Sequence, residues 1–185
     1  MDALTNLRNR ILACVWLLIS LLFPLSAVEL RAAEPPPLEY QVRAAFLLNF
    51  TRFVEWPKAE ATNTSSPFII CVDGEDPFGP TLDQLVDGET VNGRKILVHR
   101  THGEANGSCA ILYVARQEKN VRAILAAVGP GVLTVGEGDS FLDEGGMIAF
   151  VLENRRVRFN IDQAAAHKAG LQLSSRLLNV ARSIR

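Results

Sequence analysis

Two short stretches of the chain carry residue types that could perform chemistry. His99 and His102, followed by Glu104, have a spacing that metal ligands often show. The three residues are expected at the end of a strand and in a glycine-containing turn, not on one helix face. Surface histidines are therefore the better interpretation, and we expect no metal site.

The stretch Gly136–Ser140 resembles a nucleotide-binding turn, because it follows an expected strand and precedes an expected helix. It lacks the third glycine of the dinucleotide motif, and Glu137 and Asp139 stand where phosphate would bind. Turn formation and helix capping explain the same residues. The sequence also shows no serine in a nucleophile elbow. We therefore predict no catalytic residues and no cofactor, and that the protein is not an enzyme.

The N-terminus has the layout of a secretory signal peptide. Arg8 and Arg10 precede an apolar run over residues 11–25, which is shorter than the roughly 20 residues that a membrane-spanning helix needs. We expect cleavage after Ala27, with Ala33 as the other candidate and an uncleaved anchor as the alternative. This predicts a periplasmic protein with a signal peptide (1–27), a proline-rich leader (28–37) and a single domain (38–185).

Removal of residues 1–27 leaves two cysteines, Cys71 and Cys109, in a compartment that oxidises thiols. We predict a disulfide between them, and two buried free thiols are the alternative. Closing a loop of this length would stabilise the fold by about 4 kcal/mol on the chain-entropy model.

Charge gives little indication of a partner. The whole chain has a formal net charge of −1, and no basic excess points to nucleic acid. Basic residues nevertheless predominate from residue 155 to 185, where Asp162 is the single acidic residue. Such an end could face an acidic partner or lipid head groups, or it could be a set of solvated helix faces.

The elements alternate between helix and strand. Val42, Phe46, Phe50 and Phe53 recur at spacings of three and four, which predicts an amphipathic helix over 40–54. Apolar runs and turn residues predict the other elements. The expected strands are 68–72, 95–99, 109–115, 132–135, 147–153 and 156–161, and the expected helices are 76–86, 117–128, a brief one after Asp139, 162–170 and 174–184.

This order predicts an α/β fold: Rossmann-like, three-layered, with a mainly parallel sheet and an antiparallel C-terminal hairpin that turns at Asn154-Arg155. The first and third strands of such sheets are commonly neighbours. Cys71 and Cys109 lie on those two strands, so the fold would bring them within bonding reach.

Eight blocks of the sequence, in order, resemble the YfiR-like family. They are YQVRAAFLLNF (40–50), FVEWP (53–57), DPFG (76–79), VNGR (91–94), GGMI (145–148), VRF (157–159), AGL (169–171) and SSRLL (174–178). The resemblance covers about residues 38 to 183.

The resemblance implies a periplasmic repressor of an inner-membrane diguanylate cyclase of the YfiN type, which would lower cyclic-di-GMP signalling and so regulate biofilm formation. It also implies an outer-membrane, OmpA-like lipoprotein of the YfiB type as a second partner, and a possible homodimer. Cys71 and Cys109 match the family's first cysteine pair. Some relatives have a second pair near residues 145–152, where this chain has no cysteine, so a switch of two disulfides is in doubt.

For contacts with a partner, we expect exposed polar side chains near the hairpin and the last helix: Glu153, Arg155 and Arg176. The alternative function is a periplasmic small-ligand binding module, with a metabolite in an apolar cleft at the strand ends, that serves a sensor kinase or a transporter.

Overall fold

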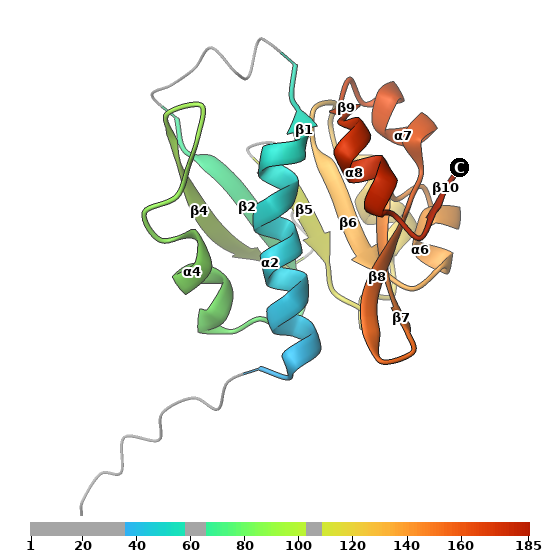
Figure 1. Ribbon diagram of the computed structural model, residues 1–185, viewed down its shortest axis with the longest axis horizontal. Helices are drawn as coiled ribbons and strands as arrows, with labels where there is room; N and C mark the ends of the chain where they lie inside the picture. The colour runs from blue at the N-terminus through green and yellow to red at the C-terminus, as the bar shows by residue number, and fades with distance from the viewer. Residues whose placement is uncertain (1–35, 58–65, 103–108) are drawn as a thin grey trace, which may run out of the picture. The chain divides into compact units, whose positions relative to one another are not determined.

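A computed structural model describes residues 36–57, 66–102 and 109–185 of the 185-residue chain. Within these ranges, no helix combines the length and the apolar character that crossing a bilayer requires. Figure 1 shows a sheet with helices packed against it.

The sheet is mixed and mostly parallel, as the sequence predicts. Its strand order is β10-β8-β7-β6-β5-β2-β4-β3, and β4, β2, β5, β6 and β7 are parallel to one another. The β7–β8 hairpin is antiparallel, and β1 and β9 form a separate two-stranded ladder. The strands are β1 (Val54–Glu55), β2 (Phe68–Asp73), β3 (Thr90–Val91), β4 (Arg94–Thr101), β5 (Cys109–Val114), β6 (Leu133–Glu137), β7 (Ile148–Glu153), β8 (Arg156–Ile161), β9 (Gln172–Leu173) and β10 (Ser183–Ile184).

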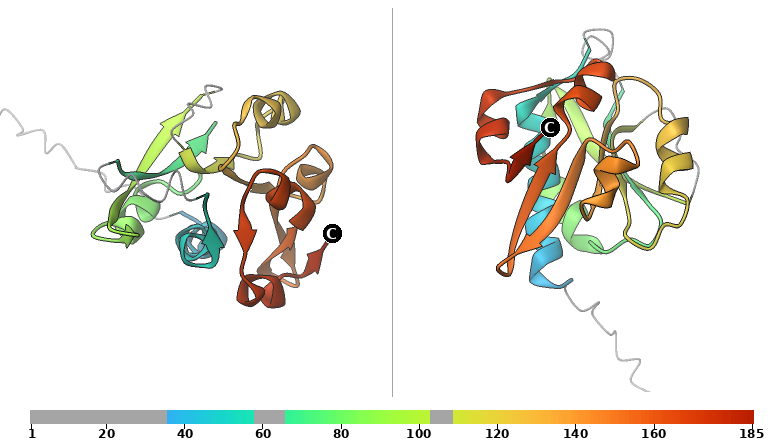
Figure 2. Two further views of the ribbon diagram at one scale, coloured as in Figure 1. Left: turned by 90° about the horizontal axis from the view of Figure 1, so that it is seen from above. Right: turned by 90° about the vertical axis from the view of Figure 1, so that its right-hand side faces the viewer.

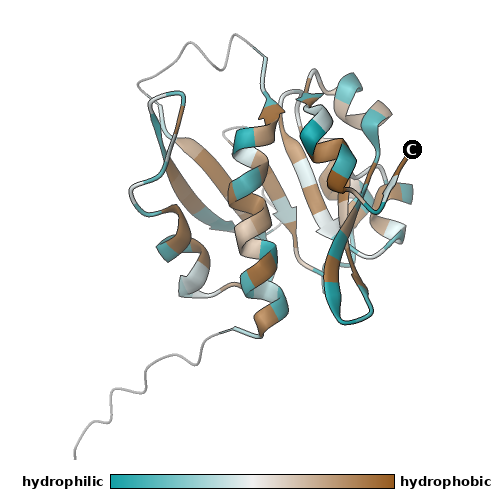
Figure 3. Ribbon diagram, in the orientation of Figure 1, coloured by the Kyte–Doolittle hydropathy of each residue, from teal (hydrophilic) through white to brown (hydrophobic). Residues whose placement is uncertain are grey.

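Helices cover both faces of the sheet, which confirms the three-layer prediction (Figure 2). One apolar cluster packs α2 and α4 against one face of the sheet. A second cluster packs α5 and α6 against the other face. The central strands are largely apolar because both of their faces are covered (Figure 3). The helices are α2 (Leu38–Phe53), α4 (Pro80–Val86), α5 (Val121–Ala127), α6 (Ser140–Asp143), α7 (Gln163–Lys168) and α8 (Ser175–Val180).

Helix α2 is attached to the hairpin by four aromatic rings. Phe46 and Phe50 of α2 pack on Phe150 and Phe159, with centroid separations of 5.3 to 5.9 Å. The predicted apolar stripe is nevertheless wrong at one position. Val42 is 37% exposed, whereas the neighbouring Arg43 is buried.

Three helix boundaries differ clearly from the prediction, and one of them is the start of α5 at Val121 in place of residue 117. The helix expected from Asp76 begins at Pro80, because the Asp76 carboxylate accepts a hydrogen bond from the backbone of Phe78 (2.8 Å) and holds the chain in a turn. The last helix ends at Val180, not Ile184. Beyond it, the chain pairs as β10 with β8, so tertiary contact overrides local helix preference.

Gly136 of the nucleotide-like stretch serves packing, as does Gly146 further along the chain. A Cβ atom on Gly136 would lie 2.4 Å from the ring of Phe141, and one on Gly146 would lie 2.1 Å from the same ring. Phe141 is therefore held between two positions that have no room for a side chain. This close approach accounts for Gly136 without any phosphate.

Gly146→Ala should lower the free energy of unfolding by about 1–3 kcal/mol, because the added methyl group overpacks the Phe141 ring. Urea denaturation of the purified protein measures the change. Gly129→Ala is the matched control, since a Cβ there meets nothing within 4 Å. Equal losses for the two variants would contradict this account of Gly146.

Candidate functional site

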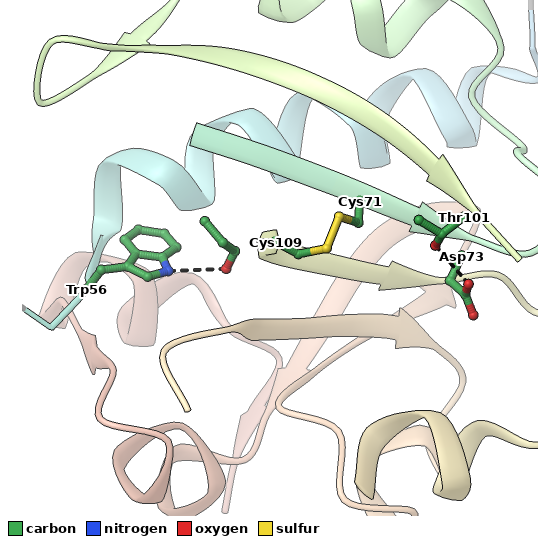
Figure 4. The surroundings of a disulfide bond; sticks show 6 residues. Trp56, Cys71, Asp73, Thr101 and Cys109 are labelled. Atoms are coloured by element: carbon green, nitrogen blue, oxygen red, sulfur yellow. Dashed lines mark hydrogen bonds between the residues drawn. A yellow bond between two sulfur atoms is a disulfide. The ribbon is translucent and has the colours of Figure 1, made fainter. Parts of the chain in front are cut away.

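A disulfide joins the two cysteines that the sequence pairs. Cys71 on β2 and Cys109 on β5 are bonded, with their Cα atoms 5.7 Å apart and both residues buried (Figure 4). The two strands are direct neighbours in the sheet. The bond lies on the sheet face that carries α5, where both cysteines belong to the second apolar cluster.

A β-bulge next to this disulfide gives Trp56 its hydrogen bond. Ile69 pairs with Cys109 and Ile70 pairs with Ile111, so Ala110 is the extra residue. The Ala110 carbonyl accepts a hydrogen bond from the Trp56 indole N–H (3.1 Å), as Figure 4 shows. The segment after α2 is thereby fixed to the strand that carries Cys109.

A buried ion pair lies at the carboxyl ends of β5 and β6. Arg43 Nη1 of α2 is 2.6 Å from Glu137 Oε2, and their side chains are 4% and 2% exposed. The Tyr113 hydroxyl donates a hydrogen bond to the same carboxylate. The guanidinium also lies 4.6 Å from the centre of the Tyr40 ring, which allows a cation–π contact. These four residues, which we call the buried clamp, connect α2 to the sheet.

The surroundings of Tyr113 and Arg43 in the buried clamp fix the protonation states of these two side chains. Burial, together with the Glu137 carboxylate, raises the pKa of the Tyr113 hydroxyl far above its usual value. Burial acts to lower the pKa of Arg43, but the attraction of Glu137 outweighs it, and the net shift is upward. Tyr113 therefore stays a hydrogen-bond donor and Arg43 stays charged at neutral pH, which suits a structural role better than proton transfer.

Sequence reasoning missed the buried clamp. Arg43 is one helical turn before Leu47 and two before Phe50, and that spacing places all three on one buried face. This spacing indicates that Arg43 is buried, but an arginine in an amphipathic helix normally lies at the surface. Glu137 lies in a stretch whose glycines predict a turn.

A small cavity lies at the strand ends. The cavity at the carboxyl ends of β5 and β6 has about 100 Å³, and its lining includes Arg116, Glu118, Glu137 and Glu144. A cavity of about 410 Å³ lies instead between α5 and α7, with Lys168 at its border. Small-ligand sites usually have roughly 300–1,000 Å³, so the cavity at the ends of β5 and β6 is smaller than a usual site. In the described ranges, no group of histidine, cysteine and acidic residues could hold a metal ion, and Glu104 lies outside these ranges.

The predicted partner-binding residues lie in two places. Glu153 is the last residue of β7, and Arg155 is in the hairpin turn. This turn lies at the same end of the domain as the start of α2 (Figure 1). Arg176 is in the first turn of α8, and the backbone of Ser174 just before it donates to Phe53 at the end of α2. The 16 residues of α2 span about 24 Å. The structure therefore brings Glu153 and Arg155 together and places Arg176 apart from them.

Part of the basic C-terminal charge is neutralised. Arg182 pairs with Glu153 (2.8 Å), and Arg185 pairs with Asp143 (2.6 Å) and Asp162 (3.0 Å). The predicted excess of positive charge is thus smaller in the fold than in the sequence, because acids from outside the segment reach it.

These features define a disulfide-stabilised α/β domain of the three-layer class. The chain belongs to the YfiR/HmsC-like family, whose model matches residues 40–182. No curated protein matches the sequence. Eight solved chains do match, among them the crystal structure of a conserved domain protein from Vibrio cholerae O1 biovar El Tor strain N16961. That similarity has 10% identity and a TM-score of 0.49, and covers 81% of this chain and 60% of that chain.

Proposed function

We propose that the protein is a periplasmic regulator that binds the periplasmic sensor region of an inner-membrane diguanylate cyclase and lowers cyclic-di-GMP signalling. The observation that carries this proposal is the match to the YfiR/HmsC-like family over residues 40–182. The Cys71–Cys109 disulfide supports the location, because disulfides persist in oxidising compartments such as the periplasm. The proposal includes a signal peptide over 1–27, a leader over 28–37 and a domain over 38–185.

Repression of this kind requires only differential binding. A regulator that binds the inactive state of the cyclase about 5.5 kcal/mol more tightly than the active state would shift its population from 1:99 to 99:1. An ordinary interface of about 800 Å² per partner can supply that preference. Catalytic side chains are not needed, and the clamped Arg43–Glu137 pair suits a rigid binding protein.

The proposed contact residues are Glu153, Arg155 and Arg176. They lie at the two ends of α2, so a partner that touches all three would extend along that helix. An OmpA-like outer-membrane lipoprotein that sequesters the protein, and a homodimer, are further parts of the proposal.

The test is binding of the protein, purified from a periplasmic extract, to the isolated periplasmic region of a membrane diguanylate cyclase encoded in the same genome. We expect saturable binding by calorimetry, and a fall in cellular cyclic-di-GMP when the protein is expressed together with the full-length cyclase. The unrelated periplasmic region of another membrane protein is the control. No binding, together with unchanged cyclic-di-GMP, would overturn the proposed function.

A further inference from the structure

The hairpin tip and the start of α2 form one end of the molecule, with apolar side chains exposed there. Phe46 packs on the Phe150–Phe159 pair. Val42 is one helical turn nearer the start of α2, and the Leu152–Val157 pair is two residues nearer the hairpin turn. The start of α2 and the hairpin turn lie at the same end of the domain in both views (Figures 1 and 2).

The side chains at this end are more exposed than their apolar character favours. Leu38 is 74% exposed, Leu152 is 54% exposed, and Val157 is half-buried. Side chains alternate along a strand, so Leu152 and Val157 share the face on which Phe150 and Phe159 meet α2. The apolar surface of the core thus continues past the covered part of the sheet into solvent.

Positive charge lies in the hairpin turn beside these apolar side chains and on the other face of the hairpin. Arg155 is in the turn, and Arg156 and Arg158 are exposed on the opposite face of the hairpin. None of the three forms an ion pair within the described part of the chain. Glu153 lies opposite Arg156 in the ladder, but its ion pair is with Arg182. The tip therefore has an apolar face and uncompensated positive charge.

We propose that this end, the tip surface (Leu38, Val42, Leu152, Arg155 and Val157), docks an amphipathic segment of the cyclase's periplasmic region that carries carboxylates beside apolar side chains. The inference rests on the proposed function and deepens it. Apolar side chains would supply the buried contact, and Arg155 in the turn would pair with a carboxylate at its border. Binding should consequently weaken as salt is raised.

The test is calorimetry with the variant Leu152→Asp/Arg155→Glu and the cyclase's periplasmic region. We expect its affinity to fall at least about 30-fold, because a charge is placed in the apolar contact and a border charge is reversed. The matched control is Leu97→Asp/Lys95→Glu on β4, at the opposite edge of the sheet, where both side chains are exposed. The control should bind within about threefold of the wild type, since rim and surface positions contribute little. A thermal melt of each variant verifies that the fold is retained.

The outcomes separate the inference from the proposed function. If the wild type fails to bind, the proposed function fails first. If the wild type binds and the tip variant binds equally well, the tip surface is not the docking site and only the inference is overturned. Two other results for the tip variant, each with unchanged cyclase binding, also overturn the inference. If the variant no longer sediments with vesicles of phosphatidylethanolamine and phosphatidylglycerol as the wild type does, the tip surface contacts a membrane. If the variant no longer forms a dimer that the wild type forms, the tip surface contacts a second copy of this chain.

Discussion

Replacement of Arg43 by alanine should lower the free energy of unfolding by about 3–5 kcal/mol, a large part of the roughly 5–15 kcal/mol that stabilises a typical domain. The substitution leaves the Glu137 carboxylate, 2% exposed, without its cation in a buried setting. The Tyr113 hydroxyl would remain as its partner and cannot neutralise it. Denaturation by urea at neutral pH, followed by circular dichroism, measures the loss.

The same helix provides the control for this prediction. Arg52 also forms an ion pair from α2, with Glu89 at 2.9 Å, but its side chain is 55% exposed. Arg52→Ala should therefore cost no more than about 1 kcal/mol. The double variant Arg43→Met/Glu137→Leu removes both charges and should lose less than Arg43→Ala alone. Equal losses for Arg43→Ala and Arg52→Ala would show that the buried clamp contributes no more than a surface pair.

Loss of the disulfide is the second large effect. The variant Cys71→Ala/Cys109→Ala should be about 4 kcal/mol less stable than the oxidised wild type, because the bond closes a loop with a sequence separation of 38. Alanine is the appropriate substitute, since a serine hydroxyl would be buried among apolar side chains. Urea denaturation of the variant and of the oxidised wild type gives the difference.

The wild type in reductant separates the bond from the side chains. Reduction keeps both sulfurs in place and removes only the cross-link, so the reduced wild type should approach the stability of the double variant. If the reduced protein stays as stable as the oxidised one, the cross-link contributes nothing and the loss in the variant comes from the empty space left by the sulfurs. Calorimetry with the cyclase's periplasmic region under both conditions then shows whether the disulfide affects binding as well as stability.

Local patterns were sufficient to predict most of the architecture. The hairpin follows from two apolar runs around Asn154-Arg155, and both residues have the positive φ values (51° and 60°) that a tight hairpin turn requires. The pairing of Cys71 with Cys109 follows from the strand order of doubly wound sheets. In each case, the signal lies in neighbouring residues or in a general rule of topology.

The missed features depend on contacts between distant residues. Arg43 and Glu137 are 94 positions apart in the sequence, and neither has a local pattern that marks it as buried. The two-residue strands β1, β9 and β10 exist because another strand lies beside them, and segments this short have no periodicity of their own. The placement of Arg176 away from Glu153 likewise depends on the path of the chain around α2.

Strand β10 also covers the outer edge of β8. It pairs with β8 through Ser183 and Ile184, and Arg185 continues the contact by donating its backbone N–H to Ile161 (2.9 Å). Without it, the outer edge of β8 would offer unpaired backbone groups to any strand of another molecule, which is the usual beginning of edge-to-edge aggregation. Strand β10 has only two residues, so its own outer edge exposes few unpaired backbone groups. The ion pairs of Arg182 and Arg185 hold this strand in place. Residues 183–185 thus close one edge of the sheet to strand pairing with another molecule.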